Sequence, residues 1–96
     1  MNHSKIRFLR DGSMLRWVDY GKYRFYFRRW EEWRGMRCAI FSISIVDESG
    51  ERRSAQYAED AGGWILVGFD MGTSHLDLPF ISMCEWDRLE IINSLA

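Results

Sequence analysis

The residues that could perform acid–base or nucleophilic chemistry are few, because the chain has two histidines among its 96 residues. Ser74, His75 and Asp77 bring a hydroxyl, an imidazole and a carboxylate close together in the sequence, and these are the groups of a nucleophilic triad. Triad residues seldom lie next to one another in a chain, and no Gly-x-Ser-x-Gly turn is present to expose a nucleophile. We therefore expect His75 to be an ordinary loop residue.

Glu31 and Glu32 could provide paired carboxylates for general acid–base catalysis. Arg28, Arg29 and Arg34 lie beside them in the sequence, so local ion pairing is the simpler account of the two negative charges. We expect no catalytic residue in this chain, and the protein is predicted not to be an enzyme.

Metal binding needs three or four ligands of matching type. Cys38 and Cys84 are far apart in the sequence, and Asp47, Glu48 and Glu51 lack the regular ligand spacing of a calcium loop. The cysteines are also too few for a disulfide framework, so we expect reduced thiols. The sequence predicts no metal site and no cofactor.

The charges are distributed unevenly along the chain, although the net charge is only −1. Residues 1–37 carry ten basic and four acidic side chains, whereas residues 38–96 carry three basic and ten acidic ones. Eleven of the thirteen basic residues are arginines, which suit bidentate and stacking contacts. A chain polarised in this way can present one basic and one acidic surface to a partner.

Exposed arginine and tryptophan are the residue types enriched in protein-interface hot spots. Five such residues lie close together in the sequence and form the predicted contact patch: Arg28, Arg29, Trp30, Trp33 and Arg34. The leading hypothesis is a non-enzymatic protein-binding module, for example a phage- or mobile-element-encoded inhibitor of a host defence complex, acting in the manner of anti-CRISPR or anti-restriction proteins.

The alternative hypothesis is binding of single-stranded nucleic acid. Arg24, Tyr26 and Arg28 alternate along one strand face, and a single strand needs cations for its phosphates and flat rings for its bases. A curved antiparallel sheet followed by a helix resembles, in topology alone, the layout of small single-strand-binding coactivator domains. The net acidic chain and its two lysines favour the protein partner.

Six segments show the apolar or alternating pattern of β-strands, separated by turn residues. They cover residues 5–10, 14–20, 23–30, 36–46, 52–58 and 64–70, with a charged loop expected at 31–35 and a turn at 11–13. Ser82 and Glu85 have the spacing of a capping box, which predicts a helix over about 83–95. Its predicted buried stripe consists of Met83, Trp86, Leu89 and Ile92, widened by Ile91 and Leu95.

These elements predict a single compact domain over residues 1–96, of the α+β class. We expect a twisted antiparallel sheet of about five or six strands in meander order, up to a half-barrel, with one C-terminal helix packed on a face. The core candidates are Phe25, Phe27, Phe41, Ile43, Ile45, Ile65, Val67, Trp86, Leu89 and Ile92.

The N-terminal residues lack the apolar segment of a signal peptide, and no apolar run approaches the ~18 residues of a membrane span. We therefore expect a cytoplasmic protein with no membrane partner. An edge strand could pair across a two-fold axis, so a homodimer stays open.

Overall fold

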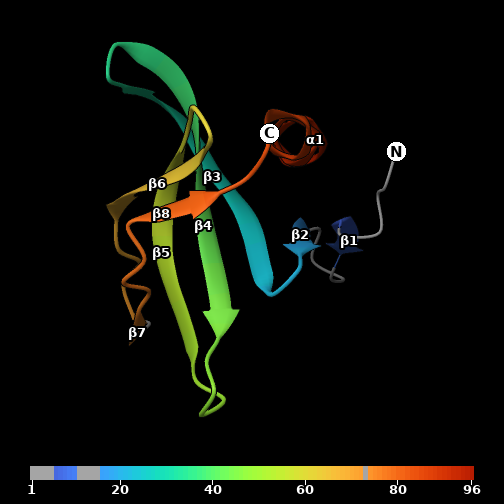
Figure 1. Ribbon diagram of the computed structural model, residues 1–96, viewed down its shortest axis with the longest axis vertical. Helices are drawn as coiled ribbons and strands as arrows, with labels where there is room; N and C mark the ends of the chain where they lie inside the picture. Colours follow the sequence, from blue (N-terminus) through green and yellow to red (C-terminus); the bar gives the residue numbers. More distant parts are fainter. Residues whose placement is uncertain (1–5, 11–15, 73) are drawn as a thin grey trace.

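The computed structural model describes residues 6–10, 16–72 and 74–96, with side chains described over 17–72 and 74–96. It contains one β-sheet and one C-terminal helix (Figure 1). In chain order the elements are β1 (Ile6–Arg10), β2 (Arg16–Tyr20), β3 (Tyr23–Trp33), β4 (Met36–Val46), β5 (Arg52–Asp60), β6 (Gly63–Gly68), β7 (Ser74–His75), β8 (Phe80–Ser82) and α1 (Glu85–Leu95).

The sheet is an antiparallel meander in which strands adjacent in sequence pair with each other from β1 to β6. β8 then pairs with β6 at the far edge, and the two-residue β7 pairs in parallel with the start of β5. The predicted meander with one C-terminal helix is confirmed, and the sheet stays open between its edge strands β1 and β8. The short strands β7 and β8 were not expected, and the turn predicted at 11–13 lies outside the described residues.

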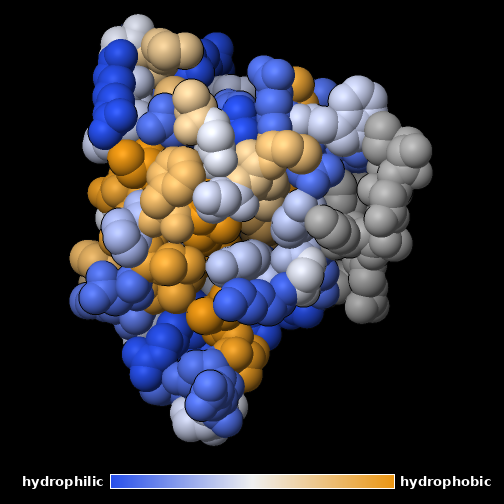
Figure 2. All heavy atoms as spheres, in the orientation of Figure 1, coloured by the Kyte–Doolittle hydropathy of each residue, from blue (hydrophilic) through white to orange (hydrophobic). Residues whose placement is uncertain are grey.

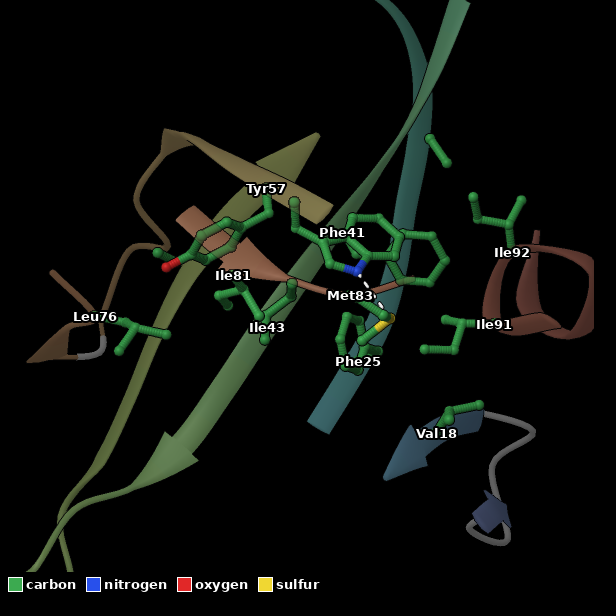
Figure 3. Packing of buried hydrophobic residues seen from close by; sticks show 13 residues of the cluster. Val18, Phe25, Phe41, Ile43, Tyr57, Leu76, Ile81, Met83, Ile91 and Ile92 are labelled. Carbon is green, nitrogen blue, oxygen red and sulfur yellow. Dashed lines mark hydrogen bonds between the residues drawn. The ribbon is translucent and has the colours of Figure 1, made fainter. Parts of the chain in front are cut away.

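The main core lies on one face of the sheet, where side chains of several strands meet those of β8 and α1 (Figure 3). Trp64 is fully buried at its centre, with its ring centroid 5.4 Å from that of Phe25 and 5.2 Å from that of Phe41. The indole N–H donates to the sulfur of Met83 over 3.3 Å, which ties β6 to the segment that leads into the helix. This polar contact satisfies the donor that burial of a tryptophan would otherwise leave unpaired.

Most of the predicted core residues are buried or partly buried, but they divide between the two faces of the sheet. Phe25, Phe41, Ile43 and Ile92 belong to the main core, and Phe27 and Ile45 are partly buried against it. Ile65 and Val67 pack instead on a second, smaller cluster formed by Cys38, Ile40 and Ala58. Because successive side chains of a strand point to opposite faces, this second cluster lies on the other side of the sheet.

The expected buried stripe of the helix was right at Met83, Ile91 and Ile92 but wrong at Trp86 and Leu89. Trp86 and Leu89 are 57% and 44% exposed, whereas Arg88, Ile91 and Ile92 form the buried face. Arg88 can be buried because its Nη1 donates to the carbonyl of Met83 over 2.5 Å and its Nε lies 3.8 Å from a carboxylate oxygen of Glu59. The buried face of the helix therefore includes the cation of Arg88, and Trp86, which the apolar periodicity placed on that face, lies outside it.

The predicted capping box was also wrong, because Ser82 belongs to β8 and the helix begins two residues after Met83. Cys84 is the N-cap residue and makes no side-chain capping hydrogen bond. Glu85 and Asp87 place negative charge in the first turn, which suits the helix dipole. Asp87 also accepts a 2.5 Å hydrogen bond from the hydroxyl of Tyr20, and burial together with this bond raises the pKa of Tyr20 to about 12. The bond fixes the first turns of α1 beside β2.

Candidate binding surfaces

The β3–β4 hairpin is longer than expected and its end projects beyond the rest of the sheet (Figure 1). Glu31, Glu32 and Trp33 belong to β3, so the charged loop predicted at 31–35 is reduced to the two-residue turn Arg34–Gly35. Both turn residues have positive φ, 54° and 77°, as the tight turn of a two-residue hairpin requires. The expected loop is therefore a rigidly paired hairpin end.

A β-bulge at Arg28 divides the predicted contact patch between the two faces of this hairpin. The register passes from the Phe27–Phe41 pair directly to the Arg29–Ile40 pair, so Arg28 is the extra residue. Beyond the bulge, Trp30 shares the main-core face with Phe27, whereas Arg29 and Trp33 lie on the opposite face. The five predicted residues thus surround the hairpin and do not form one flat surface.

We define the hairpin tip as the exposed residues Trp30, Arg34, Met36 and Arg37. Trp30 is 41% exposed and Met36 is 68% exposed. The Arg37 guanidinium lies over the Trp30 ring at 5.1 Å, and that of Arg34 lies 5.8 Å from the centre of the Trp33 ring. Figure 2 shows that hydrophilic residues cover most of this upper end of the molecule, with a small apolar group among them.

Other members of the predicted patch are engaged within the protein. Arg29 pairs with Glu31 at 2.6 Å and also donates to the side-chain amide oxygen of Gln56 over 3.0 Å. Arg34 lies 3.5 Å from a carboxylate oxygen of Asp60, and Trp33 is half-buried against the second cluster. Within the described residues, Arg37 has no carboxylate partner and is the cation of the tip that is most available to a partner.

A second feature is a hollow of about 760 Å³ on the sheet face opposite the main core. Its floor is polar because Ser42 and Ser44 alternate with core residues along β4, and Ser54 pairs with Ser44 from β5. Asp70 lies on this floor and accepts hydrogen bonds from Ser54 at 2.6 Å, Gln56 at 2.9 Å and Ser42 at 3.1 Å. These bonds and the charge of Arg28 lower the pKa of Asp70, although burial opposes them as the largest single influence. The carboxylate is therefore ionised at neutral pH.

Rings and guanidinium groups surround this polar floor. Tyr26 lies at one side, and the half-exposed Phe69 stacks on His75 with ring centroids 4.2 Å apart at the other. Arg28 makes no hydrogen bond or ion pair with the described residues beyond its attraction to Asp70, and Arg52 donates to the Ser44 hydroxyl over 2.7 Å. Both arginines lack a carboxylate ion-pair partner in the part of the chain that the structure describes.

The three residues of the nucleic-acid hypothesis are only partly brought together. Tyr26 and Arg28 both line the hollow. Arg24 lies outside it, since it forms an ion pair with Asp19 at 2.7 Å and covers the Trp17 ring at 4.7 Å. Trp17 in turn packs against Tyr26, with ring centroids 5.7 Å apart. Arg24 thus holds the ring wall in place, and Arg52 is the cation that sequence reasoning missed.

Ser74 and His75 are engaged with other residues and not with each other. The Ser74 hydroxyl donates to Glu51 over 2.6 Å, and His75 stacks on Phe69, so the local Ser-His-Asp sequence does not form a relay. No three histidine, cysteine, aspartate or glutamate side chains of the described segments are grouped so that they could hold a metal ion. Over the same segments, no helix has the length and apolar character that crossing a membrane requires.

Comparison with known proteins gives no relative. The chain matches no protein-family model, and neither curated proteins nor solved structures give a match. Function must therefore be argued from the two surfaces, the hairpin tip and the hollow.

Proposed function

We propose that this protein is a non-enzymatic protein-binding module that inserts the hairpin tip into a cleft of its partner. The observation that supports this proposal is the projecting hairpin end, which carries an exposed tryptophan beneath an arginine without a carboxylate partner in the described residues. Tryptophan and arginine at the centre of an interface commonly contribute most of the binding energy.

The partner is best matched by a cleft, because apolar groups of the tip face in both directions. Trp30 and Arg37 lie on one face of the hairpin, and Met36 shares the other face with Trp33. A flat partner surface would reach only one of these faces. The cleft would combine apolar walls with a carboxylate that can meet Arg37. An inhibitor of a host defence complex, as expected from the sequence, would act by occupying such a cleft.

The rigidity of the hairpin favours tight binding. The register of β3 and β4 continues to the last pair, Trp33 with Met36, so little chain entropy is lost when a partner encloses the tip. The stacking of Arg37 on Trp30 likewise holds the guanidinium in place before contact.

The test compares two tryptophans that are both exposed but lie on different parts of the molecule. Tagged wild-type protein, Trp30→Ala and Trp86→Ala are used to capture partners, and the affinity of each captured protein is then measured by calorimetry. Trp30→Ala should weaken binding by tenfold or more, which corresponds to about 1.4 kcal/mol, whereas Trp86→Ala should leave it unchanged. Urea unfolding of each variant checks that the fold is retained. A partner that binds Trp30→Ala as tightly as wild type would refute the role of the tip.

The alternative expected from the sequence, single-stranded nucleic-acid binding, is favoured by a different observation. Tyr26 and Arg28 line the hollow together with Arg52, on the face of the sheet that the helix does not cover.

A further inference from the structure

We propose that the hollow binds a short stretch of single-stranded nucleic acid, with one base on the polar floor and successive phosphates at Arg28 and Arg52. The inference is independent of the hairpin tip, because the two surfaces share none of their defining residues. Three properties of the hollow carry it, namely its charge pattern, its rings and the direction of its hydrogen bonds.

The charge pattern of the hollow alternates in the way that a nucleotide chain requires. Cations stand at two ends, and the Asp70 carboxylate lies on the floor between them. A uniformly anionic ligand would be repelled at the floor, whereas a neutral base flanked by phosphates would meet favourable charge throughout. The two arginines are among the three described arginine side chains that lack a carboxylate partner, so binding would break no internal ion pair.

Arg28 and Arg52 enter the hollow from different rows of the sheet. The Arg52 guanidinium is bonded to Ser44, whereas Arg28 lies beyond the row of paired residues that contains Tyr26 and Ser42. Neighbouring rows on one face of a strand are ~7 Å apart, so the backbone positions of Arg28 and Arg52 are separated by at least that distance along the sheet. This separation suits two successive phosphates of one strand.

Flat rings border the floor on which the base would lie. Tyr26 is held by the neighbouring Trp17, and Phe69 is 48% exposed while its other face stacks on His75. Aromatic rings that are fixed from behind and open in front are the usual platforms for unpaired bases. An acidic peptide would supply the charge for the arginines but would leave these rings without a partner.

The hydrogen bonds of the floor also indicate which bases fit. Ser42 and Ser54 line the hollow and donate their hydroxyl protons to Asp70, so their hydroxyl oxygens keep lone pairs that can accept. Acceptors beside a carboxylate favour a ligand group that donates. Cytosine and adenine carry an exocyclic amino group that donates, whereas thymine and uracil present carbonyl oxygens there. The floor should therefore prefer amino-bearing bases.

The test uses fluorescence anisotropy with fluorescein-labelled ten-nucleotide DNA strands of cytosine or thymine, at 50 mM and 200 mM salt. Two phosphate contacts predict a slope of about −1.4 in the logarithm of affinity against that of salt, which is roughly a sevenfold loss over this range. Arg28→Ala and Arg52→Ala should each make the slope shallower by about 0.7. Tyr26→Leu should weaken binding roughly tenfold, and the cytosine strand should bind more tightly than the thymine strand.

Arg37→Ala is the matched control, because it removes the same charge from an arginine that also lacks a carboxylate partner but lies on the hairpin tip. It should leave DNA binding unchanged. An equal loss for Arg37→Ala and Arg28→Ala would show attraction by overall charge and overturn the site. Equal affinity for a ten-residue glutamate peptide, or no binding of the cytosine strand at 100 μM protein, would overturn the proposal as well. Equal affinity for the cytosine and thymine strands would overturn the assigned floor.

Discussion

Substitution of Gly63 by alanine should destabilise the protein severely, because there is no room for a side chain where β6 meets β8. A Cβ atom at this position would lie 2.1 Å from the carbonyl oxygen of Ile81 and 2.9 Å from both the carbonyl carbon of Ile81 and a ring carbon of Phe80. To reach even a 3.0 Å separation from the oxygen, the two strands must move apart by roughly 1 Å. The obstacle is mostly backbone, which cannot turn aside as a flexible side chain can.

The expected cost follows from what this movement would disturb. Overpacking of a well-packed site costs about 1–3 kcal/mol. The displaced segment also carries the bond from the Met83 amide to the Gly62 carbonyl, 2.9 Å long, and bonds of this kind contribute about 0.5–1.5 kcal/mol each. A loss of about 3 kcal/mol is therefore expected. With a urea m-value of about 1.5 kcal/mol/M, the unfolding midpoint should fall by about 2 M.

The same strand offers a matched control. Gly68 also lies in β6, and a Cβ atom there would meet no atom within 4 Å. Neither glycine has a positive φ, so alanine strains the backbone at neither position and the contact alone distinguishes them. Urea unfolding followed by circular dichroism should place Gly68→Ala within about 0.5 kcal/mol of wild type. If Gly63→Ala also lies within that range, the close packing of β8 on β6 is wrong.

Further predictions concern the β4–β5 turn and the helix. The Ser49 hydroxyl and Arg53 donate to Asp47 and lower its pKa from 3.8 to about 2, so its contribution to stability is complete above pH 3.8 and is lost as the pH falls toward 2. A carboxyl titration by NMR that gives 3.8 or more would contradict this. Ile91→Ala should cost about 2–5 kcal/mol and the exposed Leu89→Ala about 0.5 or less, measured by urea unfolding; equal losses would place the helix incorrectly.

The sheet was predictable because each long strand has a recognisable local pattern of apolar residues. Phe25, Phe27, Phe41 and Ile43 alternate with polar or small residues, and short turns join the strands in order. The end of β3 was not recognised, because a solvated hairpin carries charge on both faces. A signal was present, since the apolar phase set by Phe25 and Phe27 resumes at Trp30, one residue late, as a single bulge produces.

The helix shows why apolar periodicity can mislead. Trp86 and Leu89 extended a regular stripe, yet Arg88, Ile91, Ile92 and Leu95 follow the i, i+3, i+4, i+7 pattern of one face. The buried position of Arg88 depends on the carbonyl of Met83 and on Glu59, a residue of another element. Such long-range compensation cannot be read from the segment itself.

The hollow was missed for a related reason. Ser42, Ser44 and Ser54 are small polar residues within strands, and by themselves they indicate only ordinary alternation. Ser42 and Ser54 form a polar floor only because they donate to Asp70, which lies in the connection after β6. Serines that alternate with Phe41 and Ile43 on a central strand were the available signal that one face of the sheet is polar and hollowed.

The chain entropy lost on closing a loop differs between the strand connections of the meander and the docking of the C-terminal helix. From β2 to β6, each strand pair is joined by a connection of five residues or fewer. The bond from Tyr20 to Asp87 instead spans 67 residues. The chain entropy lost on closing a loop grows with the logarithm of its length, so this closure costs about 2 kcal/mol more than a five-residue connection. The docking of the C-terminal helix is thus a costlier closure than any single hairpin between β2 and β6.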